Sequence, residues 1–231
     1  FTGYNYSEIN KFKDLIRNSF SEKHNIILGI NTSDENSNKI YNSLILVNNK
    51  FQIISKYNKI KLVPFGEFIP LENFLSKTGF KKITQGYGSF SKGSSIENIV
   101  LNKFNILPLI CYEIIFPELI QKNVRKTNLI VNISEDGWFG NSIGPHQHYA
   151  KGIFRAIENN SFLVRSANKG ISVIISNKGE IIKRLNINET GNIDMNIPLL
   201  NNKYKNKNDL IFLFLLITYV LIFLILKKNE K

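Results

Sequence analysis

An apolar run near the carboxy-terminal end of the chain limits what the whole molecule can be. Residues Leu210–Leu226, LIFLFLLITYVLIFLIL, carry no charge, and Thr218 and Tyr219 are the only polar residues among them. As a helix this run would extend roughly 26 Å, close to the hydrocarbon thickness of a bilayer. An amphipathic surface helix of a soluble domain has a polar face, which this run lacks. The sequence therefore predicts one transmembrane helix.

The rest of the chain has the composition of a folded domain. Hydrophobic residues make up 43% of the sequence, which is enough for a sizeable core. We predict a domain over residues 1–200, a linker over 201–209, the transmembrane helix over 210–226 and a basic tail over 227–231. Expected strands and helices alternate, with paired strands between them, which indicates an α/β sandwich.

Hydrophobic periodicity gives the expected elements. Helices are expected over 7–23, 116–124 and 147–160, with a short one over 71–76. Strands are expected over 25–30, 41–47, 51–57, 96–101, 104–110, 128–133, 162–166, 171–175 and 181–185. Loops are expected over 32–39 and 77–95, and an extended segment over 186–207.

The formal charge of +12 suggests two kinds of partner, a nucleic acid or an anionic membrane surface. The lysines are interleaved with asparagines, and the Arg-rich, aromatic-spaced clusters of a nucleic-acid binder are missing from the sequence. We therefore expect no nucleic-acid partner. Lysines scattered over a solvated surface account for the charge equally well.

The single cysteine, Cys111, lies in the stretch PLICYEIIFPEL, Pro108–Leu119. An apolar run leads into it, and Pro117 is well placed to begin a helix shortly after it. A nucleophile at the end of a buried strand benefits from the N–H groups of the following helix, which stabilise a thiolate and an oxyanion. A buried structural cysteine is the alternative, and an internal disulfide is excluded because the chain has one cysteine.

A second stretch, YNKIKLVPFGEFIP, covers Tyr57–Pro70. Its prolines and glycine prevent a regular helix or a central strand. Lys59, Lys61 and Glu67 lie among apolar residues, a mixture typical of a loop that lines a site. An ordinary surface loop is the alternative.

A third stretch, Ser134–Ala150, combines acids, glycines and histidines. Four possible metal ligands occur in it, namely Glu135, Asp136, His146 and His148. The two histidines are two residues apart, which does not place both on one helix face. We expect a positioning loop that leads into a helix, and no metal site.

Three stretches together resemble the nitrilase superfamily and, more narrowly, the bacterial apolipoprotein N-acyltransferases: Tyr57–Pro70, Ile110–Pro117 and Asn132–Gly144. LVPFGE is the most specific part, ICYEIIFPE resembles the nucleophile turn, and the final apolar run resembles a last membrane span. The resemblance implies a four-layer αββα nitrilase-like sandwich followed by one transmembrane helix. It also implies a periplasmic catalytic domain at the bacterial inner membrane, with several spans in the full-length protein.

The implied reaction moves a fatty acyl chain from a phospholipid, through a cysteine thioester, to the N-terminal amine of a diacylglyceryl-cysteine apolipoprotein. The superfamily works with a Glu–Lys–Cys triad. By resemblance, Cys111 is the nucleophile, Lys59 stabilises the thiolate and the oxyanion, and Glu67 is a further acidic residue of the site. Tyr112 and Glu113 match the residues beside the nucleophile. We expect no cofactor, and we expect a monomer.

The chain departs from the family pattern at the general-base glutamate. That residue should lie well before Lys59, after an apolar strand and next to a proline, whereas Glu8, Glu22 and Glu35 have neither. We therefore expect a carboxy-terminal fragment of a longer chain, poorly active or inactive as it stands. Two alternatives stay open: a nitrilase-like amide hydrolase, and a non-catalytic, membrane-tethered lipid-binding remnant.

Overall fold

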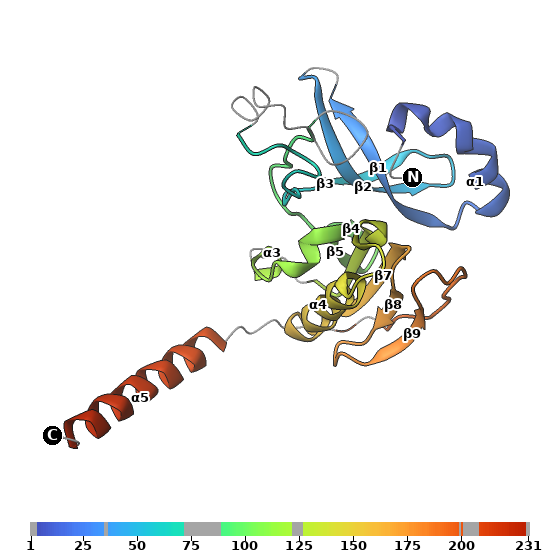
Figure 1. Ribbon diagram of the computed structural model, residues 1–231. Coiled ribbons are helices and arrows are strands. Elements are labelled where there is room, and N and C mark those ends of the chain that lie inside the picture. The colour runs from blue at the N-terminus through green and yellow to red at the C-terminus, as the bar shows by residue number, and fades with distance from the viewer. Residues whose placement is uncertain are drawn as a thin grey trace.

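The computed structural model describes residues 4–34, 37–71, 89–121, 127–198, 200 and 208–229. Two β-sheets pack face to face, with helices outside them, and a long helix stands apart (Figure 1). The helical elements are η1 (Tyr6–Phe12), α1 (Lys13–Ser19), η3 (Cys111–Ile115), α3 (Glu118–Gln121), η4 (Asp136–Phe139), α4 (Gly144–Glu158) and α5 (Asn208–Asn229). The strands are β1 (Asn25–Asp34), β2 (Lys39–Asn48), β3 (Ile53–Asn58), β4 (Ile99–Leu101), β5 (Phe104–Ile110), β6 (Leu129–Glu135), β7 (Phe162–Asn168), β8 (Ser172–Ile175) and β9 (Ile181–Leu185).

The second sheet brings two of the three predicted functional stretches to one edge. The first sheet is antiparallel, in the order β1-β2-β3. The second has the order β4-β5-β6-β7-β8-β9, and β5, β6 and β7 are mutually parallel. Parallel strands end at the same edge, so the residues that follow β5 and β6 lie close together there. These residues are the predicted nucleophile stretch and the start of the Ser134–Ala150 stretch.

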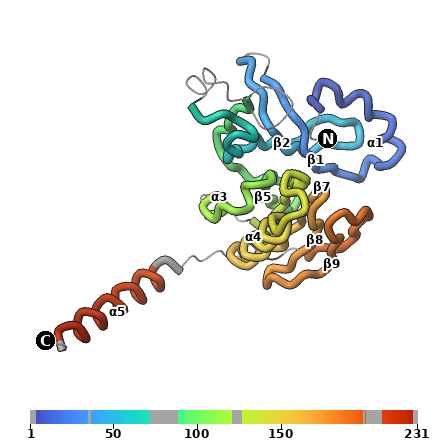
Figure 2. Tube along the Cα trace, viewed as in Figure 1, coloured from blue at the N-terminus to red at the C-terminus, as the bar shows by residue number. Residues whose placement is uncertain are grey.

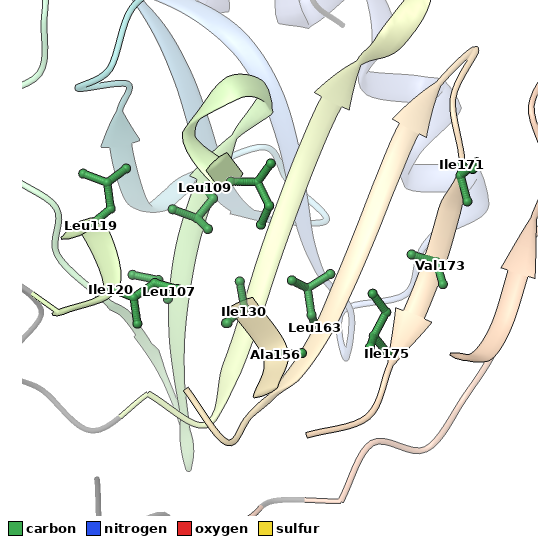
Figure 3. Close-up of a cluster of buried hydrophobic side chains, with 11 residues drawn as sticks. Leu107, Leu109, Leu119, Ile120, Ile130, Ala156, Leu163, Ile171, Val173 and Ile175 are labelled. Carbon is green, nitrogen blue, oxygen red and sulfur yellow. The ribbon is translucent and has the colours of Figure 1, made fainter. Parts of the chain in front are cut away.

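Three apolar clusters separate four layers. The cluster between α1 and the first sheet contains Ile9, Ile16, Leu28, Ile30, Ile45, Val47 and Phe51. The cluster between the sheets contains Leu44, Leu46, Tyr57, Ile99, Ile106, Ile110, Leu129, Val131, Phe162 and Ile174. The cluster between the second sheet and the helices α3 and α4 contains Leu107, Leu109, Ile114, Leu119, Ile120, Ile130, Ala156, Leu163, Ile171, Val173 and Ile175 (Figure 3). The predicted four-layer αββα order is confirmed.

The strand sequences explain why both faces of each sheet are covered. Successive side chains of a strand point to opposite faces. In β5, Leu107 and Leu109 pack toward the helices, whereas Ile106 and Ile110 pack toward the first sheet. A strand that is apolar at nearly every position is therefore buried on both sides, as expected for parallel strands between helices and a second sheet.

Some expected bounds were wrong. The helix expected over 7–23 divides into η1 and α1, and it ends at Ser19 because Phe20 has an extended backbone. The polar segment Thr32–Asp34, expected as a loop, continues β1 because its backbone pairs with β2. The helix expected from residue 116 begins at Glu118. The expectations for residues 72–88 lie outside the described residues.

The predicted transmembrane run lies within α5. By length and composition alone, this helix can cross a membrane, and none of its apolar stretch over Leu210–Lys228 is buried against the rest of the protein. The Cα trace in Figure 2 shows it projecting away from the two sheets.

Candidate active site

Cys111 occupies a strained turn at the end of β5. Its φ is +50°, a left-handed conformation that non-glycine residues rarely adopt, and it begins the short helix η3. The side chain is partly buried and its thiol is free. Strain of this kind costs about 1–3 kcal/mol and concentrates at functional sites. We refer to residues Cys111–Ile115 as the nucleophile turn.

The carboxylate of Glu113 joins the nucleophile turn to the segment Tyr57–Pro70, which we call the lysine loop. Glu113 is fully buried. Its Oε2 accepts a hydrogen bond from the Ile110 N–H at 2.9 Å. Its Oε1 accepts hydrogen bonds from the Tyr57 hydroxyl at 2.8 Å and from the N–H groups of Ile60 and Lys61 at 2.8 and 3.0 Å. One side chain thus fixes the loop that carries Lys59 beside the turn that carries the cysteine.

The protonation of this junction follows from its burial. Burial raises the pKa of Glu113, while the four donors act in the opposite direction. Burial and the nearby Glu113 carboxylate raise the pKa of Tyr57, so its hydroxyl keeps its proton and donates it. The hydroxyl and the three N–H groups therefore act together as donors to one carboxylate.

Lys59 lies almost completely buried, with 1% of its surface exposed. Its Nζ is 2.8 Å from Glu67 Oε2, and Glu67 is the one ion-pair partner of Lys59 among the described residues. Glu67 also accepts hydrogen bonds from the Asn42 side chain at 2.6 Å and from the Val63 N–H at 2.8 Å. A buried charge needs such pairing to offset its desolvation. Glu67 therefore both neutralises and orients the ammonium group.

The neighbouring lysine is different. Lys61 is partly exposed, pairs with Glu118 at 3.2 Å, and its Nζ lies 4.8 Å from the centre of the Phe116 ring. The Tyr112 ring packs edge-on against the same Phe116 ring at 4.9 Å. Glu113 thus ties the lysine loop, with its Lys59–Glu67 pair, to the turn that begins at Cys111. Tyr112, which follows the turn's first residue, packs against Phe116.

Replacing Glu113 by glutamine is expected to lower the free energy of unfolding by about 1–3 kcal/mol. The amide nitrogen would face a buried N–H donor, so at least one donor would lose its acceptor. Glu118→Gln is the matched control because it weakens a partly exposed ion pair, typically worth less than about 1 kcal/mol. Denaturant unfolding measures both variants. Equal losses would contradict the role of Glu113 as the junction.

A second polar cluster lies next to the nucleophile turn, and its connectivity was not predicted. Asp136 and Arg165 are buried and ion-paired at 2.7 Å. His148 Nδ1 lies 3.0 Å from Asp136 Oδ1, and Arg165 also donates to the Asn132 side chain. The sequence signal that could have revealed the cluster is an arginine inside the apolar strand Phe162–Ser166.

This cluster accounts for two of the four residues considered as metal ligands. Among the described residues, no group of three His, Cys, Asp or Glu side chains could hold a metal ion. His146 is exposed, and His148 is buried. Burial by itself would raise the pKa of Asp136, but the hydrogen bond between Asp136 and His148, the charge of Arg165 and the hydrogen bond from Ser134 lower it to about 2.

The chain is similar in sequence to known proteins. The family described as Carbon-nitrogen hydrolase matches residues 17–200. The apolipoprotein N-acyltransferase of Rhizobium etli (strain CIAT 652) is 39% identical over 167 residues, which cover 72% of this chain and 31% of that protein. The apolipoprotein N-acyltransferase of Rickettsia typhi (strain Wilmington) is 38% identical over 174 residues, covering 74% and 34% respectively. The chain thus spans about a third of the length of these relatives.

Solved structures share the fold at lower sequence identity. Nit3 of Saccharomyces cerevisiae, a member of branch 10 of the nitrilase superfamily, has a TM-score of 0.57 at 21% identity, over 80% of this chain and 62% of that one. A carbon-nitrogen hydrolase from Helicobacter pylori G27 has a TM-score of 0.57 at 16% identity, over 80% and 65%. At these identities the likeness concerns the fold alone.

Proposed function

The chain belongs to the carbon-nitrogen hydrolase family, and from that premise we propose that it is the catalytic domain of an N-acyltransferase of lipoprotein maturation. The donor is a phospholipid, and the acceptor is the N-terminal amine of a diacylglyceryl-cysteine apolipoprotein. Similarity to apolipoprotein N-acyltransferases supports this choice. The domain faces the periplasm, and α5 anchors it to the inner membrane.

The observation that carries the proposal is the junction at Glu113. It joins a cysteine in a strained, left-handed turn to a loop whose buried lysine is paired with Glu67. A nucleophile, a fixed cation and a short helix that starts at the nucleophile are the parts that acyl transfer through a thioester requires.

The first half-reaction forms the thioester. The Cys111 sulfur, as a thiolate, attacks the carbonyl carbon of the phospholipid ester, and a C–S bond forms. The Lys59 ammonium stabilises the negative oxygen of the tetrahedral intermediate. The ester C–O bond then breaks, and the lysophospholipid oxygen leaves with the proton that the general base took from the thiol. The resemblance assigns that base to a glutamate.

The second half-reaction transfers the acyl chain. The apolipoprotein amine attacks the thioester carbonyl, a C–N bond forms and the C–S bond breaks. The amine loses one proton to the base, and the Cys111 thiolate is regenerated. The same lysine serves the oxyanion of this step, since both intermediates carry their charge at the same position. No electron transfer is involved, so the reaction needs no redox cofactor.

The test is acylation of the full-length native protein in detergent micelles. With a phosphatidylethanolamine that carries labelled ester-linked chains, we expect one hydroxylamine-sensitive label, on Cys111. The matched control is an ether-linked phosphatidylethanolamine, which has the same head group but no ester carbonyl. A thioester from small amides and none from phospholipid would support the amide hydrolase. Labelling by neither substrate would support the non-catalytic remnant.

A further inference from the structure

His148 holds the backbone of the nucleophile. Its Nε2 lies 3.1 Å from the Cys111 carbonyl oxygen. A carbonyl oxygen can only accept, so Nε2 carries the proton and donates it. His148 is on α4 and is 4% exposed, whereas Cys111 follows β5. A buried side chain from a distant part of the chain therefore contacts the carbonyl of the residue whose φ of +50° forms the nucleophile turn.

The ring of His148 is itself fixed by charged groups. Its Nδ1 lies 3.0 Å from Asp136 Oδ1 and 3.1 Å from Arg165 Nη2. Asp136 is held in turn by Arg165 at 2.7 and 2.9 Å and by the Ser134 hydroxyl at 2.6 Å. Because these contacts hold Nδ1, they fix the orientation of the whole imidazole ring, including Nε2. Nε2 therefore points at the Cys111 carbonyl.

The same cluster contacts β5 a second time. The Asn132 side chain, which accepts a hydrogen bond from Arg165, donates to the Leu109 carbonyl at 3.1 Å. Leu109 lies two residues before Cys111. Two carbonyls at the end of β5 are thus held by side chains that share Arg165. One contact precedes the bend at Cys111 and the other follows it, so together they hold the backbone on both sides of the bend.

We propose that His148 is a positioning residue: its Nε2–H holds the Cys111 carbonyl and so keeps the nucleophile turn in its reactive conformation. The peptide that carries this carbonyl also carries the Tyr112 N–H on its opposite side, since the trans peptide is planar. Holding one end fixes the direction of the other, which is a potential donor to the oxyanion. The catalytic consequence rests on the proposed acyl-transfer function. The contacts that hold the turn do not depend on which substrate the protein uses.

Two variants separate positioning from mere packing. In His148→Gln the amide nitrogen reaches the place of Nε2 and keeps a donor for the carbonyl. In His148→Asn the amide nitrogen takes the place of Nδ1, so the contact with Asp136 is kept and the donor to Cys111 is lost. We expect His148→Asn to slow thioester formation by about 100-fold, the scale of a 1 Å misplacement. We expect His148→Gln to recover most of this rate, with little change in KM for phospholipid.

The alkylation of Cys111 by iodoacetamide, measured in the same full-length proteins, keeps this test independent of the lipid substrate. Slower alkylation in His148→Asn, restored in His148→Gln, supports the positioning role. If phospholipid acylates none of the proteins, that result rejects the proposed function and leaves the positioning role supported. Equal rates in the wild type and His148→Asn, or equal losses in both variants, would overturn the role. In the unsubstituted protein, ¹⁵N spectra must show His148 protonated at Nε2; an unprotonated Nε2 would also overturn it.

Discussion

Cys111→Ser is expected to abolish formation of the acyl-enzyme while leaving the protein folded. Serine has nearly the same shape, but its hydroxyl is far less acidic than a thiol and stays protonated beside a lysine. Loss of the nucleophile in a catalytic triad costs up to about a millionfold in kcat, so a loss of at least about 1,000-fold is expected here. The measurement is labelling by ester-linked phosphatidylethanolamine, with thermal unfolding to verify the fold.

Cys111→Gly provides a control for the strain at this position. Glycine adopts a φ of +50° without the clash that a Cβ atom causes, so the variant is expected to unfold no more readily than Cys111→Ala. Both variants should be inactive. Activity near that of the wild type in any of the three would reject Cys111 as the nucleophile. Lower stability in Cys111→Gly than in Cys111→Ala would contradict the strained turn.

The strands that hold the site could be predicted because they are continuous apolar runs with clear ends. The bounds of β5, which leads into the nucleophile turn, match the expected strand over 104–110. β1 was predicted too short because its last residues are polar. Thr32, for example, is buried, with its hydroxyl 2.7 Å from that of Ser43. Pairing with a neighbouring strand overrides such local polarity, and one segment alone gives no information about it.

The site itself could be predicted only as separate pieces. Resemblance assigned Glu113 a place beside the nucleophile, but its four hydrogen bonds depend on how the lysine loop packs against β5. The pairing of Asp136 with Arg165 joins residues 29 positions apart and requires the parallel arrangement of β6 and β7. The one sign of this pairing in the sequence is Arg165, a charged residue within an otherwise apolar strand.

Lys59→Ala is expected to lower the rate of thioester formation by about 100- to 1,000-fold, the usual effect of removing one oxyanion contact. Lys61→Ala is the matched control. It removes a lysine of the same loop that is partly exposed and pairs with Glu118 outside the site, so we expect a change of less than about threefold. Single-turnover labelling by phosphatidylethanolamine measures both variants. Equal losses would mean that Lys59 is not the lysine of the site.

Stability must be separated from chemistry, because removing one partner of a buried ion pair can cost about 3–5 kcal/mol. The double variant Lys59→Met/Glu67→Gln addresses this. Methionine fills much of the lysine volume, and glutamine keeps an oxygen for the Val63 N–H, so neither charge is left unpaired. We expect this protein to unfold at a higher temperature than Lys59→Ala and to be equally inactive. Recovery of activity along with stability would show that Lys59 supports the fold and not the reaction.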